Sequence, residues 1–216
     1  AGGRRVDELI AIAREFQVAS IGVTTSDDAA TVRAAVPQAR VVVGDEGLAE
    51  LAAGSEIVVN AVVGFAGLTA TLSALESGRR LALANKESLV AAAPLVDEVR
   101  ASRPTDLVPI DSEHCAIHQC LAGASPDNHY ESVKRLLLTA SGGPFRTKSV
   151  DELQHVTIAD ALAHPTWSMG PKITVDSSTL MNKGLEVLEA SALFGIGVAR
   201  IDVVVHPQSI VHSMVE

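Results

Sequence analysis

Residues 109–120, PIDSEHCAIHQC, place two carboxylates, a hydroxyl and an imidazole directly after an apolar run. Asp111 and Glu113 stand two positions apart, so at the end of a strand both side chains can point to the same side. Two carboxylates this close repel one another unless a cation lies between them. Because hard oxygen ligands suit Mg²⁺ or Mn²⁺, the pair predicts a divalent-cation site, although a solvated turn with helix-capping acids has the same pattern.

A metal site of this kind needs a third acidic ligand, and residues 177–195 supply candidates. This stretch has the periodicity of one helix and contains Glu186 and Glu189. His114 and His118 form an H-x-x-x-H pair that could bind zinc from one helical face, but the glutamate of the H-E-x-x-H motif is absent. We therefore expect oxygen ligands and a hard cation.

Groups suited to binding a phosphate occur in the second half of the chain. Ser141 opens an S-G-G turn, which is a candidate nest of backbone amides. Ser177, Asn182 and Lys183 fall near the start of the expected helix, where hydroxyl, amide and ammonium groups suit an anion. Ser177 has an ordinary alternative role as a plain helix N-cap.

Weaker signals occur in the first half. Lys86 is followed at once by Glu87, a pattern that also fits a surface ion pair of little energetic value. Residues 64–67, GFAG, have the spacing of a tight strand-to-helix turn, but the chain contains no G-x-G-x-x-G. Backbone packing explains this turn equally well.

The first 111 residues alternate between helical and strand patterns. We expect helices between strands at 18–25, 40–44, 56–64, 79–85 and 106–111. This alternation predicts a doubly wound, Rossmann-like parallel sheet with helices on both faces, and the strand at 56–64 should be buried on both faces. Such sheets bind ligands beyond the carboxyl ends of their strands, where the polar groups at 64–67, 85–87 and 111–113 would meet.

Residues 112–216 have a different, α+β pattern. We expect a strand at 133–141, short helices and loop over 151–170, one helix at 177–195 and one or two strands around His206. The boundary between the two predicted domains, 1–111 and 112–216, falls near residue 111.

Composition excludes some classes of function. The 216 residues are 47% hydrophobic and 20% charged, as in globular chains with a core of their own. The net charge of −9 argues against nucleic acid as a general partner, although a local basic cluster still permits an anionic substrate. No apolar run of about 18 residues predicts a membrane span, and no export leader is visible.

The cysteines and the chain ends give two further expectations. Cys115 and Cys120 are five residues apart, which on a helix separates them by roughly 140°. We expect both to be unpaired small core residues in a reducing compartment. The chain starts without Met and stops soon after an apolar run, so both ends look cut from a longer protein.

Five stretches together resemble the 1-deoxy-D-xylulose 5-phosphate reductoisomerase family. They are LANKESLV (83–90), PIDSEHCAIHQCL (109–121), LTASGGPFR (138–146), AHPTWSMGPKITVDSSTLMNKGLEVLEA (163–190) and VVVHPQSIVHSMV (203–215). The resemblance covers nearly the whole chain. It implies an enzyme that rearranges 1-deoxy-D-xylulose 5-phosphate and reduces the product with NADPH to 2-C-methyl-D-erythritol 4-phosphate, an isoprenoid precursor. It also implies Mn²⁺ or Mg²⁺, a homodimer and a bacterial cytoplasmic location.

The resemblance assigns roles to individual residues. It implies that the metal ligands are Asp111, Glu113 and Glu186. It implies that catalysis involves these three with Lys86, His114 and His164. The implied substrate contacts are Lys86, Ser112, Glu113, Ser141, His164, Trp167, Ser177, Asn182, Lys183 and Glu186. The implied NADPH contacts are Gly2, Gly3, Arg4, Gly64, Gly67, Asn85, Glu87, Met169 and Gly170. His114 and His206 would line the site.

Some of the family pattern is missing from this chain. The Gly-rich phosphate loop of the family should precede residue 1, and its helical C-terminal part should follow residue 216. We therefore expect most of the metal and substrate site but part of the NADPH site. Two alternatives stay open: another NADP-linked dehydrogenase on the same fold, which would need no metal, and a non-catalytic fragment that binds metal and sugar phosphate without NADPH.

Overall fold

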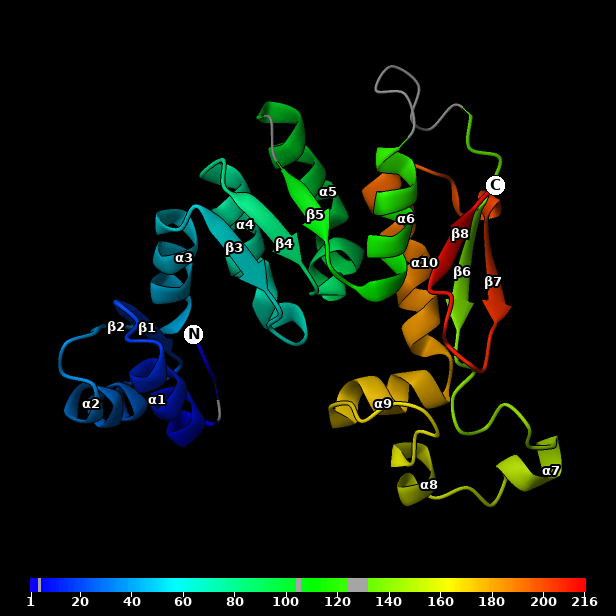
Figure 1. The fold of residues 1–216 in the computed structure, drawn as a ribbon, viewed down its shortest axis with the longest axis horizontal. Helices are drawn as coiled ribbons and strands as arrows, with labels where there is room; N and C mark the ends of the chain where they lie inside the picture. Colours follow the sequence, from blue (N-terminus) through cyan, green and yellow to red (C-terminus); the bar gives the residue numbers. More distant parts are fainter. Residues whose placement is uncertain (4, 104–105, 124–131) are drawn as a thin grey trace. The chain divides into compact units, whose positions relative to one another are not determined.

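The computed structural model describes residues 1–3, 5–103, 106–123 and 132–216, and Figure 1 shows the order of their elements. The chain forms two compact units. The first unit comprises Ala1–Ser88 with Pro94–Val108, and the second comprises Leu89–Ala93 with Pro109–Glu216. The chain therefore passes from one unit to the other three times.

The first unit has the alternating helices and strands that its sequence predicts. Its strands are β1 (Ser20–Val23), β2 (Arg40–Val43), β3 (Ile57–Asn60), β4 (Arg80–Leu83) and β5 (Leu107–Pro109). Its helices are α1 (Val6–Glu15), α2 (Ser26–Ala35), α3 (Gly44–Gly54), α4 (Leu68–Glu76) and α5 (Lys86–Ser102). Helix α5 is kinked at Ala92, two residues before Pro94, whose ring cannot continue the helical hydrogen bonding.

The strands of this part form two sheets, where the sequence predicts one. β1 pairs in parallel with β2, and a separate sheet has the order β3-β4-β5, with β3 and β4 parallel. The expectation that β3 is buried on both faces is wrong, since Ile57 and Val59 are 57% and 66% exposed. Side chains alternate across a strand, and no element of the described residues covers the face to which these two point.

The core around β1 shows why the first helices form where they do. Ile10 and Ala13 of α1 are buried with Ile21 of β1 and Val32 of α2. Their spacing puts apolar side chains on one face of each helix, so the helices can pack on the sheet. At the start of α2, Thr25 accepts a hydrogen bond from the Asp28 amide at 3.1 Å and caps the helix.

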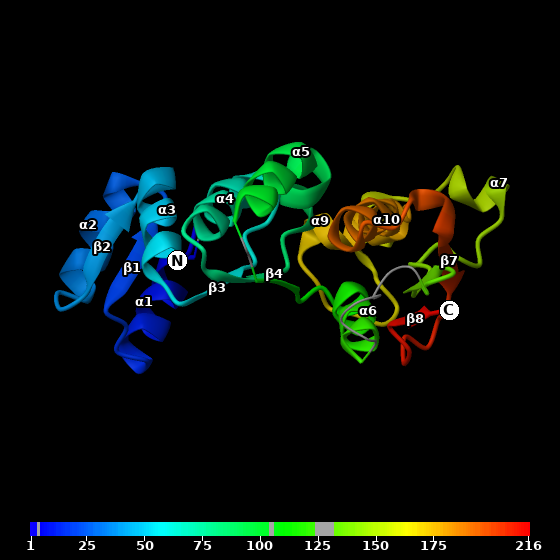
Figure 2. The same cartoon turned by 90° about the horizontal axis from the view of Figure 1, so that it is seen from above.

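The second unit contains a three-stranded mixed sheet of order β7-β6-β8. β6 (Leu136–Ala140) pairs in parallel with β7 (Ile201–Val205) and antiparallel with β8 (Ser213–Val215). The helices are α6 (Ser112–Ala122), α7 (Val150–Leu153), α8 (Ile158–Leu162), α9 (Pro171–Ser178) and α10 (Met181–Phe194). α6 and α10 pack beside the sheet (Figures 1 and 2). The strands predicted at 133–141 and around His206 are confirmed.

The single helix expected at 177–195 is wrong, because two helices meet there. α9 ends at Ser178 and α10 begins at Met181. Between them Leu180 has φ +60°, a left-handed conformation that no α-helix continues through. Ser177 therefore lies in the last turn of α9, so it is not an N-cap and has no helix N-terminus to offer an anion.

Both cysteines lie on α6 and are free thiols. Cys115 is partly buried, whereas Cys120 is exposed, so the prediction of a core position is wrong for Cys120. The buried face of α6 is formed by His114, Ile117 and Leu121, and Cys120 falls outside that stripe. In the ranges that the structure describes, no helix combines the length and apolar character that a membrane span requires.

Candidate active site

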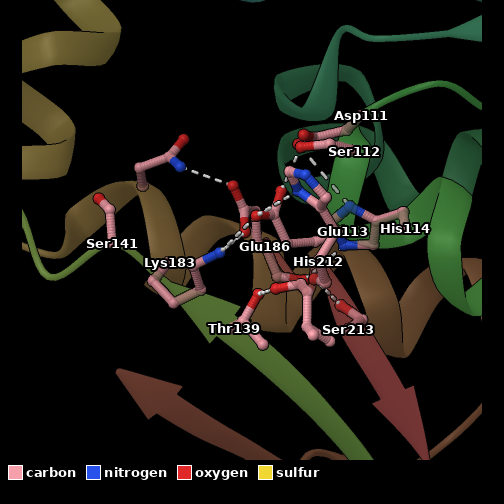
Figure 3. A network of polar contacts seen from close by, with 12 residues as sticks. Asp111, Ser112, Glu113, His114, Thr139, Ser141, Lys183, Glu186, His212 and Ser213 are labelled. Atoms are coloured by element: carbon pink, nitrogen blue, oxygen red, sulfur yellow. Dashed lines mark hydrogen bonds and ion pairs between the residues drawn. The ribbon is translucent and has the colours of Figure 1, made fainter. Parts of the chain in front are cut away.

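Three carboxylates from two helices meet in the second unit (Figure 3). Asp111 is the N-cap residue of α6, Glu113 lies in its first turn, and Glu186 lies on α10. One oxygen atom from each carboxylate lies within 4.8 Å of the other two. Glu186 is fully buried and the other two are partly buried. Three hard oxygen ligands at this spacing fit a divalent cation such as Mg²⁺ or Mn²⁺.

Two polar neighbours hold Glu186. Lys183 is 7% exposed, and its ammonium forms an ion pair with Glu186 and lies 3.6 Å from Oε1 of Glu113. Asn182 donates from Nδ2 to Glu186 Oε1 at 2.5 Å. Buried carboxylates need such partners, because taking a charge out of water costs several kcal/mol. Lys183 therefore offsets part of the negative charge of the cluster.

His114 lies next to this cluster and is fully buried. Its Nε2 donates to the backbone carbonyl of Glu186 at 2.9 Å, and its Nδ1 lies 3.4 Å from Glu189 Oε2 and 3.7 Å from Asp111 Oδ2. Burial acts to lower the pKa of the imidazole. The nearby carboxylates of Asp111 and Glu189 outweigh it and raise the pKa of His114 to about 9.

Glu189 is the other acid that the sequence offers as a third metal ligand. It groups with His114 and Asp111, again with ligand atoms within 4.8 Å of one another, whereas Glu186 groups with Asp111 and Glu113. Among the described residues, neither group includes His118. This geometry therefore gives no support to the zinc alternative.

A cavity with about 630 Å³ of empty volume, part of it open to solvent, lies against the three carboxylates. Its walls include Asp111, Met169 and most of the residues predicted to bind substrate, namely Glu113, Ser141, His164, Trp167, Ser177, Asn182, Lys183 and Glu186. All of them belong to the second unit. The fold thus brings an ammonium, two hydroxyls and an amide to the same cavity as the carboxylates.

His164 shapes the loop that forms one wall of the cavity. The backbone amides of Thr166 and Trp167 donate to its Nδ1 at 3.1 and 2.9 Å. Because Nδ1 accepts, the proton of the neutral ring sits on Nε2, which lies 3.0 Å from Ser141 Oγ. Burial and the positive charge of Arg146 lower the pKa of His164. The ring is therefore neutral at pH 7.

The turn at Ser141, Gly142 and Gly143 packs tightly against the end of α9. Gly142 and Gly143 have φ +86° and +65°. A Cβ on Gly143 would lie 2.5 Å from the carbonyl oxygen of Ser177, so the close approach requires glycine. The Gly143 amide donates to Ser141 Oγ at 3.4 Å. This contact brings Ser141 and Ser177 to one cavity.

In the first unit, Asn85 joins two of the polar strand ends that the sequence places together. Asn85 is the N-cap of α5, accepting from the Ser88 amide at 3.0 Å, and its Nδ2 donates to the Gly64 carbonyl at 2.7 Å. Asn60 donates to the Gly67 carbonyl at 2.8 Å and fixes the other side of the same turn. A Cβ on Gly67 would lie 2.6 Å from Asn85 Cγ. Gly67 is therefore needed for this contact.

Other predicted site residues have simpler surroundings. Lys86 is 6% exposed, so it is not half of a plain surface ion pair with Glu87. Ser112 donates to Glu113 Oε2 at 2.7 Å and is not among the residues that line the cavity. Gly170 is the N-cap of α9. The Gly2 amide donates to the Gly22 carbonyl at 3.1 Å.

Among the described residues, Gly3 and His206 are not part of the cavity wall. Gly3 is exposed, with nothing within 4 Å of where a Cβ would be, and Arg4 lies outside the described residues. The His206 ring accepts the backbone amides of Ile210 and Val211 at 3.1 and 3.3 Å, so it stabilises the turn before β8. His114 is also not among the residues that line this cavity.

His212 is a residue of the site that the sequence argument did not identify. It lines the cavity, and its Nδ1 lies 3.7 Å from Oε1 of Glu113. Ser209, in the same turn, and Ile173 of α9 also line the cavity. The sequence does carry one signal for His212. His206 and His212 flank the turn between two predicted strands, and such a turn returns the chain to the same end of a sheet.

The fold and the site together define an α/β protein with a carboxylate cluster, suited to a divalent cation, on the wall of a polar cavity. Family models give the particular assignment. The model of 1-deoxy-D-xylulose 5-phosphate reductoisomerase matches residues 1–93, and the model of its C-terminal domain matches residues 107–194. The chain belongs to the 1-deoxy-D-xylulose 5-phosphate reductoisomerase family.

Curated relatives and solved structures agree with this assignment. The 1-deoxy-D-xylulose 5-phosphate reductoisomerase of Bacillus cereus (strain Q1) is 50% identical over 100% of this chain and 56% of its own length. That of Thermosynechococcus vestitus is 47% identical over 100% of this chain and 53% of its own length. The chain therefore spans about half the length of the curated relatives that it matches.

Solved structures of the family cover this whole chain. A DOX-P reductoisomerase in complex with NADPH, fosmidomycin and magnesium has a TM-score of 0.93 at 44% identity, and 55% of its chain is covered. The 1-deoxy-D-xylulose 5-phosphate reductoisomerase from Zymomonas mobilis, in complex with NADPH, has a TM-score of 0.88 at 39% identity, again with 55% covered. The α/β fold predicted from the sequence is confirmed.

Proposed function

We propose that this chain is the part of a 1-deoxy-D-xylulose 5-phosphate reductoisomerase that binds the metal ion and the substrate. The whole protein would convert 1-deoxy-D-xylulose 5-phosphate to 2-C-methyl-D-erythritol 4-phosphate, using NADPH, in isoprenoid precursor synthesis. One observation supports this proposal most strongly. The cavity is bordered by the three carboxylates and, on the same wall of α9 and α10, by the hydroxyl, amide and ammonium of Ser177, Asn182 and Lys183.

Asp111, Glu113 and Glu186 would hold Mg²⁺ or Mn²⁺ through their carboxylate oxygens. When bound, such an ion supplies Lewis-acid stabilisation of negative charge on substrate oxygens. Lys183, Asn182 and the two cavity serines would bind the phosphate, and this remote binding energy would orient the reacting carbons. Lys86 and Ser112 would contact the carbonyl and hydroxyl end of the substrate.

The loop at His164 and Trp167 would close the cavity against water. The Nδ1 contacts of His164 fix the shape of this loop, and its Nε2–H donates toward Ser141. Trp167 is 47% exposed and lines the cavity, so its indole is available to cover a bound substrate. Exclusion of water strengthens each polar contact with the substrate.

The nicotinamide cofactor would bind in part to the first unit. The turn at Gly64–Gly67, with Asn85 and Glu87, would contact NADPH, and Gly2, Gly3 and Arg4 would meet its adenosine end. Met169 and Gly170 would approach the nicotinamide from the loop. When bound, NADPH supplies the hydride that reduces the rearranged aldehyde. The rigid hydrogen bonds of Asn85 support this assignment, because a fixed turn can hold a cofactor precisely in place.

The decisive assay follows NADPH oxidation by the natural full-length protein with 1-deoxy-D-xylulose 5-phosphate and Mn²⁺. We expect turnover that disappears without metal and falls sharply in Glu186→Gln. Metal-independent turnover of another substrate would favour a different NADP-linked dehydrogenase. Tight Mn²⁺ binding without NADPH binding would favour a non-catalytic fragment.

The assembly and location are also proposals. β7 is an edge strand, and Val203, Val204 and Val205 on it are 44%, 39% and 49% exposed. An apolar edge strand is a site for pairing with another strand, so we propose a homodimer formed through the second unit. Sedimentation of the full-length protein tests the dimer. We also propose that the enzyme works in the bacterial cytoplasm, where NADPH is supplied.

A further inference from the structure

Glu189 and His114 form a buried pair next to the carboxylate cluster. Both are fully buried, and neither lines the cavity that is bordered by Asp111, Glu113 and Glu186. A buried carboxylate is costly to maintain unless a partner of opposite charge compensates it. The position of Glu189 therefore calls for a function that it can perform without touching substrate.

The His114 ring connects Glu189 to two of the proposed metal ligands, Asp111 and Glu186, which Figure 3 shows near it. Its Nε2 donates to the Glu186 carbonyl at 2.9 Å, while its Nδ1 lies 3.4 Å from Glu189 and 3.7 Å from Asp111. The ring also stacks on Phe194, with centroids 6.5 Å apart and planes at 18°. His114 is thus held by α10 on several sides, and it presents Nδ1 to the Asp111 carboxylate.

We propose that Glu189 is a positioning residue for the metal site: through the His114 ring it fixes Asp111 relative to Glu186, and it does not itself bind the metal. The inference rests on the proposed metal site. Asp111 and Glu186 belong to different helices, α6 and α10, so some contact must set their separation. In other metal sites, polar groups outside the ligand set contact the ligating carboxylates and fix their orientation.

The alternative is a second cation bound by Asp111, His114 and Glu189. Such an ion would have to reach a place where His114 and Glu189 are both 0% exposed, away from the cavity. A metal site needs an entry path. The burial of this pair therefore favours an orienting contact over a second ligand set.

The first test is a pulsed EPR measurement on the natural full-length protein with bound Mn²⁺. The proposal predicts no ¹⁴N coupling of the size that a directly bound imidazole gives. A strong ¹⁴N coupling that is lost in His114→Gln would mean that His114 is a ligand, and it would overturn the proposal while leaving the metal site in place. Failure to bind Mn²⁺ at all would instead contradict the proposed function.

The second test is a double-mutant cycle on Mn²⁺ affinity. Glu189→Gln keeps the size of the side chain and should weaken Mn²⁺ binding by about 10- to 100-fold. His114→Gln keeps a donor for the Glu186 carbonyl but removes Nδ1. If Glu189 acts through the ring, Glu189→Gln adds nothing further in the His114→Gln background. If Glu189→Gln weakens Mn²⁺ binding equally in the natural protein and in His114→Gln, the proposal is overturned.

A charge control and a folding control complete the test. Asp151→Asn removes one negative charge from an exposed position of the same unit and should leave Mn²⁺ affinity unchanged. Thermal unfolding without metal shows whether each variant is folded. A folded Glu189→Gln with wild-type affinity contradicts the proposal. If that variant does not fold, Glu189→Asp, which keeps the charge, replaces it in the cycle, and wild-type Mn²⁺ affinity in this shorter variant contradicts the proposal.

Discussion

Lys183 shows at the scale of one residue how the site balances charge before any ligand binds. Its ammonium contacts Glu186 and lies 3.6 Å from Glu113, so it offsets two of the three carboxylates of the cluster. The same ammonium lines the cavity, where a phosphate would approach. One side chain therefore connects the metal ligands to the proposed phosphate pocket.

Lys183→Met should destabilise the metal-free protein by about 3–5 kcal/mol, because it leaves the buried Glu186 carboxylate without its cation. Mn²⁺ should restore more stability to this variant than to the natural protein, since a divalent cation can replace the lost charge. Urea unfolding with and without Mn²⁺ measures both effects.

Lys172→Met is the matched control for that variant. Lys172 forms an ion pair with Asp176 at 2.8 Å on the surface, and its loss should cost less than about 1 kcal/mol. If both variants lose the same small amount of stability and respond equally to Mn²⁺, Lys183 does not offset the negative charge of the carboxylate cluster.

Gly67→Ala should destabilise the protein by about 1–3 kcal/mol, because the added Cβ would lie 2.6 Å from Asn85 Cγ and force that side chain away from the turn. In the full-length protein, NADPH binding should weaken as well. Gly54→Ala is the control, since nothing lies within 4 Å of its added Cβ. Chemical denaturation measures the free energy of unfolding of both variants. Equal values would show that Asn85 moves away from the added methyl group without loss of stability.

At the scale of elements, the loop after α8 depends on the protonation state of His164. Two loop amides donate to Nδ1, and a proton on Nδ1 would displace both. Burial and Arg146 lower the pKa of His164 in the folded protein. The unfolded chain, which titrates near the ordinary value of about 6.5, therefore takes up the proton first as the pH falls.

We expect the free energy of unfolding to fall as the pH is lowered from about 6.5 to the lower pKa that His164 has in the folded protein. Above that range the ring is neutral in both states, and its contribution to stability is fully present. His164→Asn keeps an acceptor for the two amides and does not titrate, so its stability should depend less on pH. Identical pH profiles for the two proteins would rule out His164 as the cause.

Some features of the fold and the site follow from neighbouring residues in the sequence, whereas others depend on tertiary structure. The pairing of Asp111 with Glu113 was readable because repulsion between neighbouring acids depends on spacing alone. The break between α9 and α10 was not, because Leu180 adopts a left-handed conformation that nothing about leucine favours. His212 was missed because its contact with Glu113 depends on how β8 pairs with β6, which is a tertiary feature. The periodicity of apolar residues predicts where strands form but not which strands pair, so it could not predict that the expected sheet is split into two.

At the scale of the whole molecule, part of α5 belongs to the second unit. Leu89 and Ala92 are 1% and 4% exposed, and they lie in the stretch that joins that unit. Residues 109–216 expressed alone would lack these side chains and expose apolar surface. We therefore expect this fragment to unfold at a lower urea concentration than the second unit does in the intact chain.

The fluorescence of Trp167 can follow that unfolding, because it is the single tryptophan of the sequence and lies in the second unit. A fragment that begins at residue 109 should also bind a hydrophobic dye more strongly than the intact chain. The same unfolding midpoint in both would show that residues 89–93 contribute little to this core.

The threefold passage of the chain between its units limits how the protein can be recombined. A chimera that takes its second unit from a relative cannot be made with one crossover after β5, because the stretch Leu89–Ala93 would stay with the wrong parent. Two separate segments have to be exchanged together. Libraries that shuffle these genes should therefore yield functional hybrids mainly when the kinked helix and the C-terminal half come from the same source.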